Sequence, residues 1–325
     1  MKIFLLLSLL SSTAFAAEAD LFQDLFAAPK RPGNNRVSYE GQLYEKENVQ
    51  GKIAELSLQK HRMRASHTLR NDPAFLNVEG NVELDQTKTT AVFPDSRNAL
   101  PKQLWNVSLS GNYRKPLEGE RSIGASLGIG SPSDKPFRTM REVSLSANFT
   151  YRFPAGKAKD QWLVLVNESN TRGFLPWIPL PGVGYLFDRS DSWKLFVGAP
   201  VLGFFWRPGG KWFLSGFYFP VQSGQVEISY YLFGPARAYF GFRSGQDVFL
   251  RAGRDDKRDR LFAVERDLHL GFTMPLNAYL LMDLGARYTF KRDYYEGKGF
   301  SDRKTGRRLD VEPASSFGLK LVALF

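Results

Sequence analysis

Cysteine and histidine, two residue types that often act in catalysis or metal binding, are rare in this sequence of 325 residues. There is no cysteine, so a thiolate metal site is not possible, and there are three histidines. Asp267 stands two positions before His269, so on a strand their side chains share one face, and Ser66 stands beside His67. Serine, histidine and aspartate are the groups of nucleophilic catalysis, so the faces on which they lie decide whether they can act.

A larger set of candidates consists of charges at alternate positions of strand-like segments. We predict that these charges line one common interior. The set is Glu79, Glu83, Arg152, Arg207, Arg237, Arg243, Asp283, Arg287, Lys291 and Lys320. Basic residues outnumber acids in the later half, which favours an interior with a modest preference for anions. The alternative is that the charges form structural ion pairs that brace a filled interior.

The elements that must position these charges are strands. In residues 143–153 every second residue is apolar and those between are mostly small and polar, and residues 104–113, 122–129 and 278–291 repeat this alternation. An arginine such as Arg287 costs roughly 2–4 kcal/mol if it faces lipid near the midplane and little if it faces water. In a membrane barrel the charged faces would therefore point inward. A soluble β-sandwich also alternates, with its apolar faces inside.

The start of the chain predicts export. Lys2 precedes an apolar run over residues 3–10, and Ala14-Phe15-Ala16 is the small-residue pattern of a secretory cleavage site. The run is about half the ~20 residues that a spanning helix needs. We expect a signal peptide in residues 1–16, an N-terminal periplasmic arm in residues 17–35 and one domain in residues 36–325.

The end of the chain decides between the sandwich and the membrane barrel. Residues 315–325, SSFGLKLVALF, alternate apolar residues back from the terminal Phe325. This segment resembles the C-terminal signature of bacterial outer-membrane β-barrels, in which it closes the barrel and is read by the insertion machinery. The run FLPWIPLPGVGYLF over residues 174–187 resembles porin-like barrels, a likeness that implies no particular function. We predict an all-β, antiparallel, up-and-down transmembrane β-barrel.

Connection lengths agree with this topology. If the last strand runs inward, the inner turns are residues 115–118, 154–159, 208–210, 233–235 and 274–277, all short, and the long connections lie outside. Residues 64–73 are the exception, a longish connection on the inner side. Sixteen candidate strands result. Merging residues 185–187, 193–197 and 201–207 into one bent strand around Gly198-Ala199-Pro200 leaves about 14, with 12 to 16 possible.

The central run departs from the strand pattern. Its prolines forbid a continuous ladder, yet its other residues are too apolar for a free loop. We expect this segment either to fold inward as a constriction loop or to lie in the membrane interface as an aromatic girdle. The possible constriction residues are Phe174, Trp177, Ile178 and Leu180.

An enzymatic function is not expected. A lipid-directed hydrolase needs its serine and histidine on the outer wall, whereas we expect His61 and His269 to face the interior and His67 to lie in a connection. We therefore assign no catalytic residue, metal or cofactor.

The expected function is a porin-like channel or solute transporter of the bacterial outer membrane, with a partly basic, partly aromatic lumen. The alternatives are a plugged, non-conducting barrel that acts as a surface or adhesion module through residues 292–313, and an outer-membrane lipid hydrolase. The formal net charge of +11 suits an anionic partner, but export argues against nucleic acid. The expected partners are small solutes, outer-membrane lipid and lipopolysaccharide, and the barrel-insertion machinery through the Phe325 strand.

Overall fold

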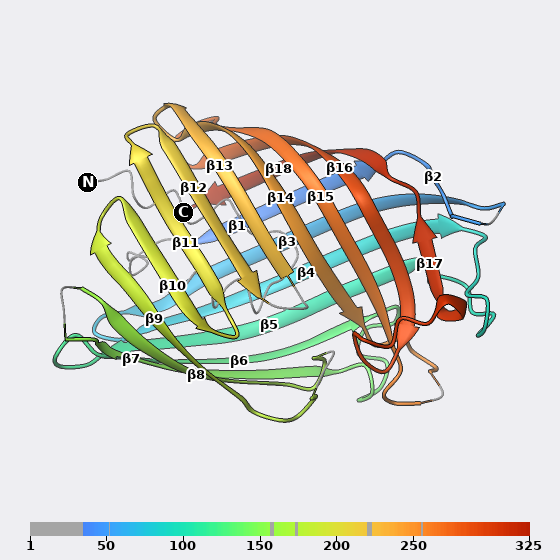
Figure 1. The fold of residues 1–325 in the computed structure, drawn as a ribbon, viewed down its shortest axis with the longest axis horizontal. Coiled ribbons are helices and arrows are strands. Elements are labelled where there is room, and N and C mark those ends of the chain that lie inside the picture. The colour runs from blue at the N-terminus through green and yellow to red at the C-terminus, as the bar shows by residue number, and fades with distance from the viewer. Residues whose placement is uncertain (1–34, 52, 157–158, 173–174, 220–222, 255) are drawn as a thin grey trace.

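The computed structural model is built almost entirely of antiparallel strands (Figure 1). It describes residues 35–325 except residues 52, 157–158, 173–174, 220–222 and 255, so the expected signal peptide and most of the N-terminal arm lie outside the described residues. The described strands are β1 (Arg36–Tyr44), β2 (Glu47–Asn48), β3 (Glu55–Asn71), β4 (Phe75–Thr89), β5 (Gln103–Pro116), β6 (Ser122–Ser133), β7 (Ser144–Pro154), β8 (Gln161–Ser169), β9 (Leu180–Ser190), β10 (Trp193–Ala199), β11 (Leu202–Gly209), β12 (Trp212–Phe219), β13 (Ser223–Phe233), β14 (Ala236–Phe249), β15 (Arg260–Pro275), β16 (Leu280–Gly297), β17 (Arg308–Val311) and β18 (Ala314–Leu324).

The sheet closes on itself as a barrel. Strand β1 pairs with β3 on one side and with β18 on the other, so that Tyr39 has both Met63 and Leu321 as Cα partners. Eighteen strands less the short β2 and β17 leave sixteen in the ring. This number lies at the upper limit of the predicted range. The merged bent strand was wrong, because β9, β10 and β11 each pair along their length with separate neighbours.

All long connections of the ring lie at the same end of the barrel, together with the two-residue connection 200–201, and the other end has only short connections. At one end, here called the terminal end, Asn35 and Phe325 pair by backbone hydrogen bonds of 3.0 and 3.2 Å. The connections at this end are residues 72–74, 117–121, 155–160, 191–192, 210–211, 234–235 and 276–279, all short. The expected exception at residues 64–73 disappears, because β3 continues to Asn71. Short turns are typical of the periplasmic side, so the opposite end, here called the loop end, faces outward.

The polarity of the wall is the reverse of that in a soluble protein. Along β3, Lys60 and Arg62 are buried whereas Met63 is exposed, and Leu127 and Phe317 on other strands are 69% and 65% exposed. Apolar side chains thus point outward all round the ring, and polar side chains point inward over most of it, with β8–β12 as the exception. This is the arrangement of a transmembrane β-barrel and excludes the β-sandwich. None of the described helical segments could cross a membrane as a helix.

The height of the wall varies around the ring. Strands β3, β15 and β16 have 17, 16 and 18 residues, whereas β10, β11 and β12 have 7, 8 and 8. A spanning strand needs about 9–11 residues, so one side exceeds the bilayer and the other falls short of it. We call β14–β18 with β1–β4 the tall wall and β10–β12 the low wall. Strands β5–β7, whose inward residues are mostly serine, asparagine and glycine, form the small-residue wall.

The loop end is bridged above the low wall. The connection between β14 and β15 lies beside the loop-end termini of β6–β8 (Figure 1). The bridging bonds join Leu250 to Pro132, Ala252 to Asp134 and Arg260 to Asn170, at 2.6, 2.6 and 2.9 Å. Beside this bridge, Phe93 and Leu100 pack with Leu261, Tyr294 and Val311 in a buried apolar cluster, the apolar cap. Part of the loop end is therefore closed by packed side chains.

Candidate functional site

The interior of the tall wall carries a buried network of ion pairs. Lys60 Nζ lies 2.7 Å from Glu265 and 3.5 Å from Asp85, and Arg292 Nε lies 3.0 Å from the same Glu265. Arg292 also pairs with Glu47 and stacks over the Tyr44 ring at 4.0 Å. Burial raises the pKa of Glu47, which lies in β2 outside the spanning strands, while Arg292 acts in the opposite direction. This layer lies directly beneath the apolar cap.

A second layer of charges lies nearer the middle of the same wall. Glu83 lies 3.7 Å from Arg62 and 3.4 Å from Arg64, and Arg36 lies 3.6 Å from Glu79. All five side chains are nearly fully buried. Removing one partner of a buried pair costs about 3–5 kcal/mol, because the other charge is left uncompensated. These residues therefore hold the tall wall in one arrangement.

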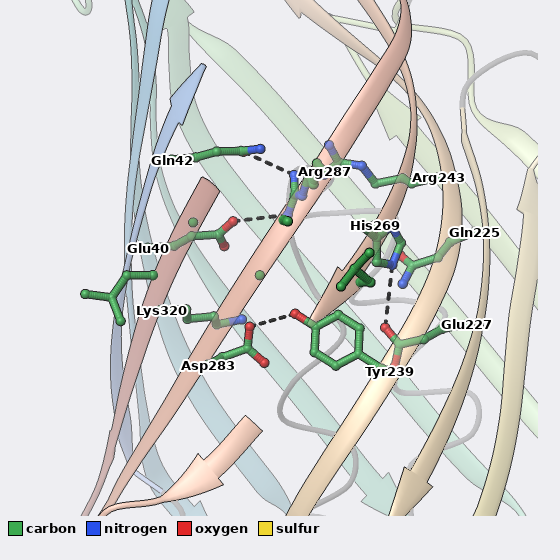
Figure 2. Close-up of a pocket in the computed structure, with 15 residues that line it drawn as sticks. Glu40, Gln42, Gln225, Glu227, Tyr239, Arg243, His269, Asp283, Arg287 and Lys320 are labelled. Atoms are coloured by element: carbon green, nitrogen blue, oxygen red, sulfur yellow. Dashed lines mark hydrogen bonds and ion pairs between the residues drawn. The ribbon is translucent and has the colours of Figure 1, made fainter. Parts of the chain in front are cut away.

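A polar chamber lies between β1, β13–β16 and β18 (Figure 2). Arg287 lies 3.3 Å from Glu40, and Tyr239 donates a hydrogen bond of 2.7 Å to Asp283. Lys320 has Glu40 and Asp283 as its Cα partners, but no hydrogen bond or ion pair of its ammonium group occurs among the described residues. The cavity is about 50 Å³, room for a few waters. The chamber itself is therefore nearly filled by its lining side chains.

Most of the charges predicted to line the interior lie on inward faces. Glu79, Glu83, Arg237, Arg243 and Lys320 are buried inside the barrel, and Asp283 and Arg287 line the chamber. Arg237 pairs with Glu227 and Arg243 pairs with Asp267, each at 2.8 Å. Arg152 shares the inward face of β7 with Asn148, and Arg207 stacks on Tyr231 at 6.0 Å. The pairing agrees with the alternative reading of structural ion pairs.

Lys291 is the exception and was placed on the wrong face. Arg266 has Lys291 as its Cα partner and the next residue, Asp267, has Thr289, so a β-bulge inserts one residue into β16. The bulge reverses the inward parity, since side chains alternate with period two. Lys291 therefore shares the outward face with the exposed Arg266, and Arg292 takes the interior position.

Several interior charges were missed by the sequence analysis. They are Arg36, Glu40, Glu47, Lys60, Arg62, Arg64, Glu265 and Arg292. A signal for three of them was present, because Lys60, Arg62 and Arg64 stand at alternate positions. Glu47 gave no such signal, since it reaches Arg292 from the two-residue strand β2, 245 residues away in the chain.

The central run does not form an inward constriction in the described residues. Trp177 is 57% exposed and borders the same outer cavity as the outward-facing Leu127, Ile129 and Leu145, which favours the interfacial alternative. Ile178 is also exposed, and Leu180 begins β9 opposite Asn167. Phe174 lies outside the described residues.

The remaining two sectors of the interior differ in character. On the small-residue wall, inward residues such as Ser108, Asn112 and Ser126 are half-buried, so there is space for water beside them. Next to it, the side chains facing inward from β8–β10 form a packed apolar cluster that includes Leu163, Leu186 and Phe196. The lumen is thus bordered by ion pairs, small polar groups and apolar groups in turn.

The histidines provide a correction. His61 lies on the outward face and its Nδ1 lies 2.9 Å from the exposed Tyr39 hydroxyl, so the expected inward position was wrong. His67 lies within β3 and not in a connection. His269 is buried inside, 3.3 Å from Asp267 and 3.8 Å from Glu227. No described serine bonds to any of these imidazoles, and no described group of acids and histidines is arranged to hold a metal ion.

The architecture is that of a bacterial outer-membrane β-barrel, as closure, outward apolar faces and a polar interior require. The chain is similar to the solved toluene transporter TodX of Pseudomonas putida, at 9% identity and TM-score 0.43, over 97% of this chain and 95% of that one. It is also similar to an outer-membrane channel of Pseudomonas putida F1, at 9% identity and TM-score 0.40, over 91% and 97%.

A third similar structure is OccK2 of Pseudomonas aeruginosa, at 13% identity and TM-score 0.33, over 90% of this chain and 98% of that one. No family model and no curated protein matches the sequence. Structural similarity this distant says nothing about the function of this chain. The function has to be inferred from the side chains inside the barrel.

Proposed function

We propose that the protein is a porin-like channel for small solutes, with its water-filled path along the small-residue wall. The observation that carries this proposal is that most of the small inward residues of β5–β7 are half-buried, whereas the charges of the tall wall are buried and mostly paired. Charge selectivity in this proposal is weak, because most of the basic residues neutralise acids. Insertion into the membrane would use the closing strand that ends at Phe325.

The route would enter over the low wall. The bridge and the apolar cap obstruct the loop end, whereas β10–β12 are too short to span the bilayer and have an apolar inner face. A solute with an apolar part could contact this face while its polar part contacts the serines and asparagines of the small-residue wall.

Single-channel recording in planar bilayers tests the proposal. Ser126 points inward from the middle of β6, and its neighbour Ala125 is small and exposed on the outward face. We expect Ser126→Trp to lower conductance severalfold, because the indole would occupy the path, and Ala125→Trp to leave it unchanged. Equal conductance in both variants would contradict the proposed path.

A second candidate function is a plugged, non-conducting barrel. The apolar cap and the small chamber support it, since both fill lumen space beside the tall wall. A folded barrel that inserts and remains silent in the same recordings would favour this candidate.

A further inference from the structure

The connection between β6 and β7, residues 134–143, exposes three cations and no fully exposed acid. Lys135, Arg138 and Arg141 are exposed, and none of them forms an ion pair with another described residue. The two acids of the connection are engaged instead: Asp134 accepts a backbone N–H at 2.6 Å and Glu142 accepts one at 2.7 Å. The three exposed charges of the segment are therefore all cations, and its two acids are buried or half-buried.

The same connection also exposes two large apolar side chains. Phe137 is 49% exposed and Met140 is 80% exposed, and both stand between the cations. The backbone N–H of Phe137 donates a hydrogen bond of 3.0 Å to Ser131 Oγ. Ser131 follows Ile129 on the outward face of β6, so the connection at Phe137 lies on the lipid-facing side of this strand. Cations beside exposed apolar groups are typical of a segment at a membrane interface.

Below this connection the outward wall is hollow. The cavity, about 570 Å³, is lined mainly by outward-facing apolar residues of β5–β7, including Leu127 and Leu145, with Trp177 from the next connection at its edge. A side chain added at Gly111 would meet no atom within 4 Å, so the glycine leaves this floor open. One acid, Glu168, also lines the cavity.

The backbone is strained where it presents these apolar groups. Phe137, Leu175 and Trp177 have φ of 57°, 45° and 66°, in the left-handed region that large residues rarely adopt. The Arg172 guanidinium holds the second connection, donating hydrogen bonds of 3.0 Å to the Ile178 carbonyl and 2.9 Å to the Asn167 carbonyl. Such strain persists where surrounding structure fixes it, often at binding sites.

We propose that this surface is a docking site for a phosphorylated lipid of the outer leaflet. The lipid phosphate binds Lys135, Arg138 and Arg141, and one acyl chain fills the cavity beside Gly111 and Trp177. The site lies on the outside of the barrel and does not depend on whether the lumen conducts.

The test measures the dissociation constant of bisphosphorylated lipid A for the full-length barrel in detergent, by native mass spectrometry. In the variant with Lys135→Gln, Arg138→Gln and Arg141→Gln we expect binding to weaken on the order of 100-fold, since each cation near a lipid phosphate contributes about a fivefold factor. The matched control replaces three exposed cations near the connection between β4 and β5, at the same end, in the same way: Lys88, Arg97 and Lys102. We expect this control variant to bind lipid A as tightly as the parent protein does.

A second pair of variants tests the acyl chain. Gly111→Leu fills the cavity and is expected to weaken binding about tenfold, whereas Ala65→Leu, on the exposed outward face of β3, is expected to have no effect. Heat-modifiable gel mobility verifies that each variant is folded. Equal losses in the two charge variants, or binding unaffected by Gly111→Leu, would overturn the proposal, as would equal binding of the dephosphorylated lipid.

Discussion

The tall wall and the low wall of this barrel obey the same alternation but use it differently. In the tall wall, inward positions hold long charged side chains that reach one another, as in the 2.7 Å contact between Lys60 and Glu265. In and beside the low wall, inward positions hold apolar groups such as Phe196 and Leu186, and outward positions hold apolar groups as well. One side of the interior is therefore filled by paired charges and the other by an apolar cluster.

The difference shows that lumen-facing and water-facing are not the same property. A charged inward residue in the tall wall is nearly as buried as a core residue, so its main effect is on stability. A small inward residue between the two walls keeps access to water. A path for solutes is therefore expected where the side chains are short, not where the charges are most numerous.

The largest expected effect comes from breaking the tall-wall network. Arg292→Leu leaves Glu265 short of one partner and Glu47 buried without its arginine, so we expect the free energy of unfolding to fall by about 3–5 kcal/mol. Lys291→Leu, one residue earlier on the outward face, is expected to change it by less than about 0.5 kcal/mol. Chemical unfolding in detergent measures both, and the reverse order would contradict the assignment of the bulge.

A smaller effect is expected from overpacking beside the low wall. A side chain added at Gly184 would lie 2.2 Å from the Phe196 ring, so Gly184→Val is expected to destabilise the barrel by about 1–3 kcal/mol. Gly80→Val, at a glycine of β4 with open space, serves as the control. If both variants unfold at the same denaturant concentration, the inner face of the low wall is not packed as described.

The sequence predicted the barrel well because its main signal is local. Alternation with period two, short turns and the terminal segment are all readable within about ten residues, and they placed Glu79, Arg237 and Lys320 on inward faces. The same signal was available in β3, where Lys60, Arg62 and Arg64 alternate with His61. The predicted connection at residues 64–73 ended this strand too early, and His61 was assigned to the wrong face.

The features that were missed depend on pairing between strands. The bulge in β16 exists only relative to β15, so no pattern within residues 280–297 distinguishes Lys291 from Arg292 as the inward residue. The separation of β10 from β11 at Pro200 likewise depends on their pairing, because a proline is compatible with both a bend and a strand end. The position of Trp177 depends on hydrogen bonds from Arg172 to the carbonyls of Ile178 and Asn167, which fix the connection between β8 and β9.

The central claim is that the lumen is open along the small-residue wall and filled along the tall wall. The natural absence of cysteine allows a direct measurement. Ser126 and Ser66 both point inward, but Ser126 is half-buried, whereas Ser66 is 7% exposed and bonded to Asn77 at 3.1 Å. Single variants Ser126→Cys and Ser66→Cys can be treated with a charged, membrane-impermeant thiol reagent during bilayer recording. We predict rapid modification and loss of current for Ser126→Cys and no reaction for Ser66→Cys, and equal rates or faster modification of Ser66→Cys would contradict the account.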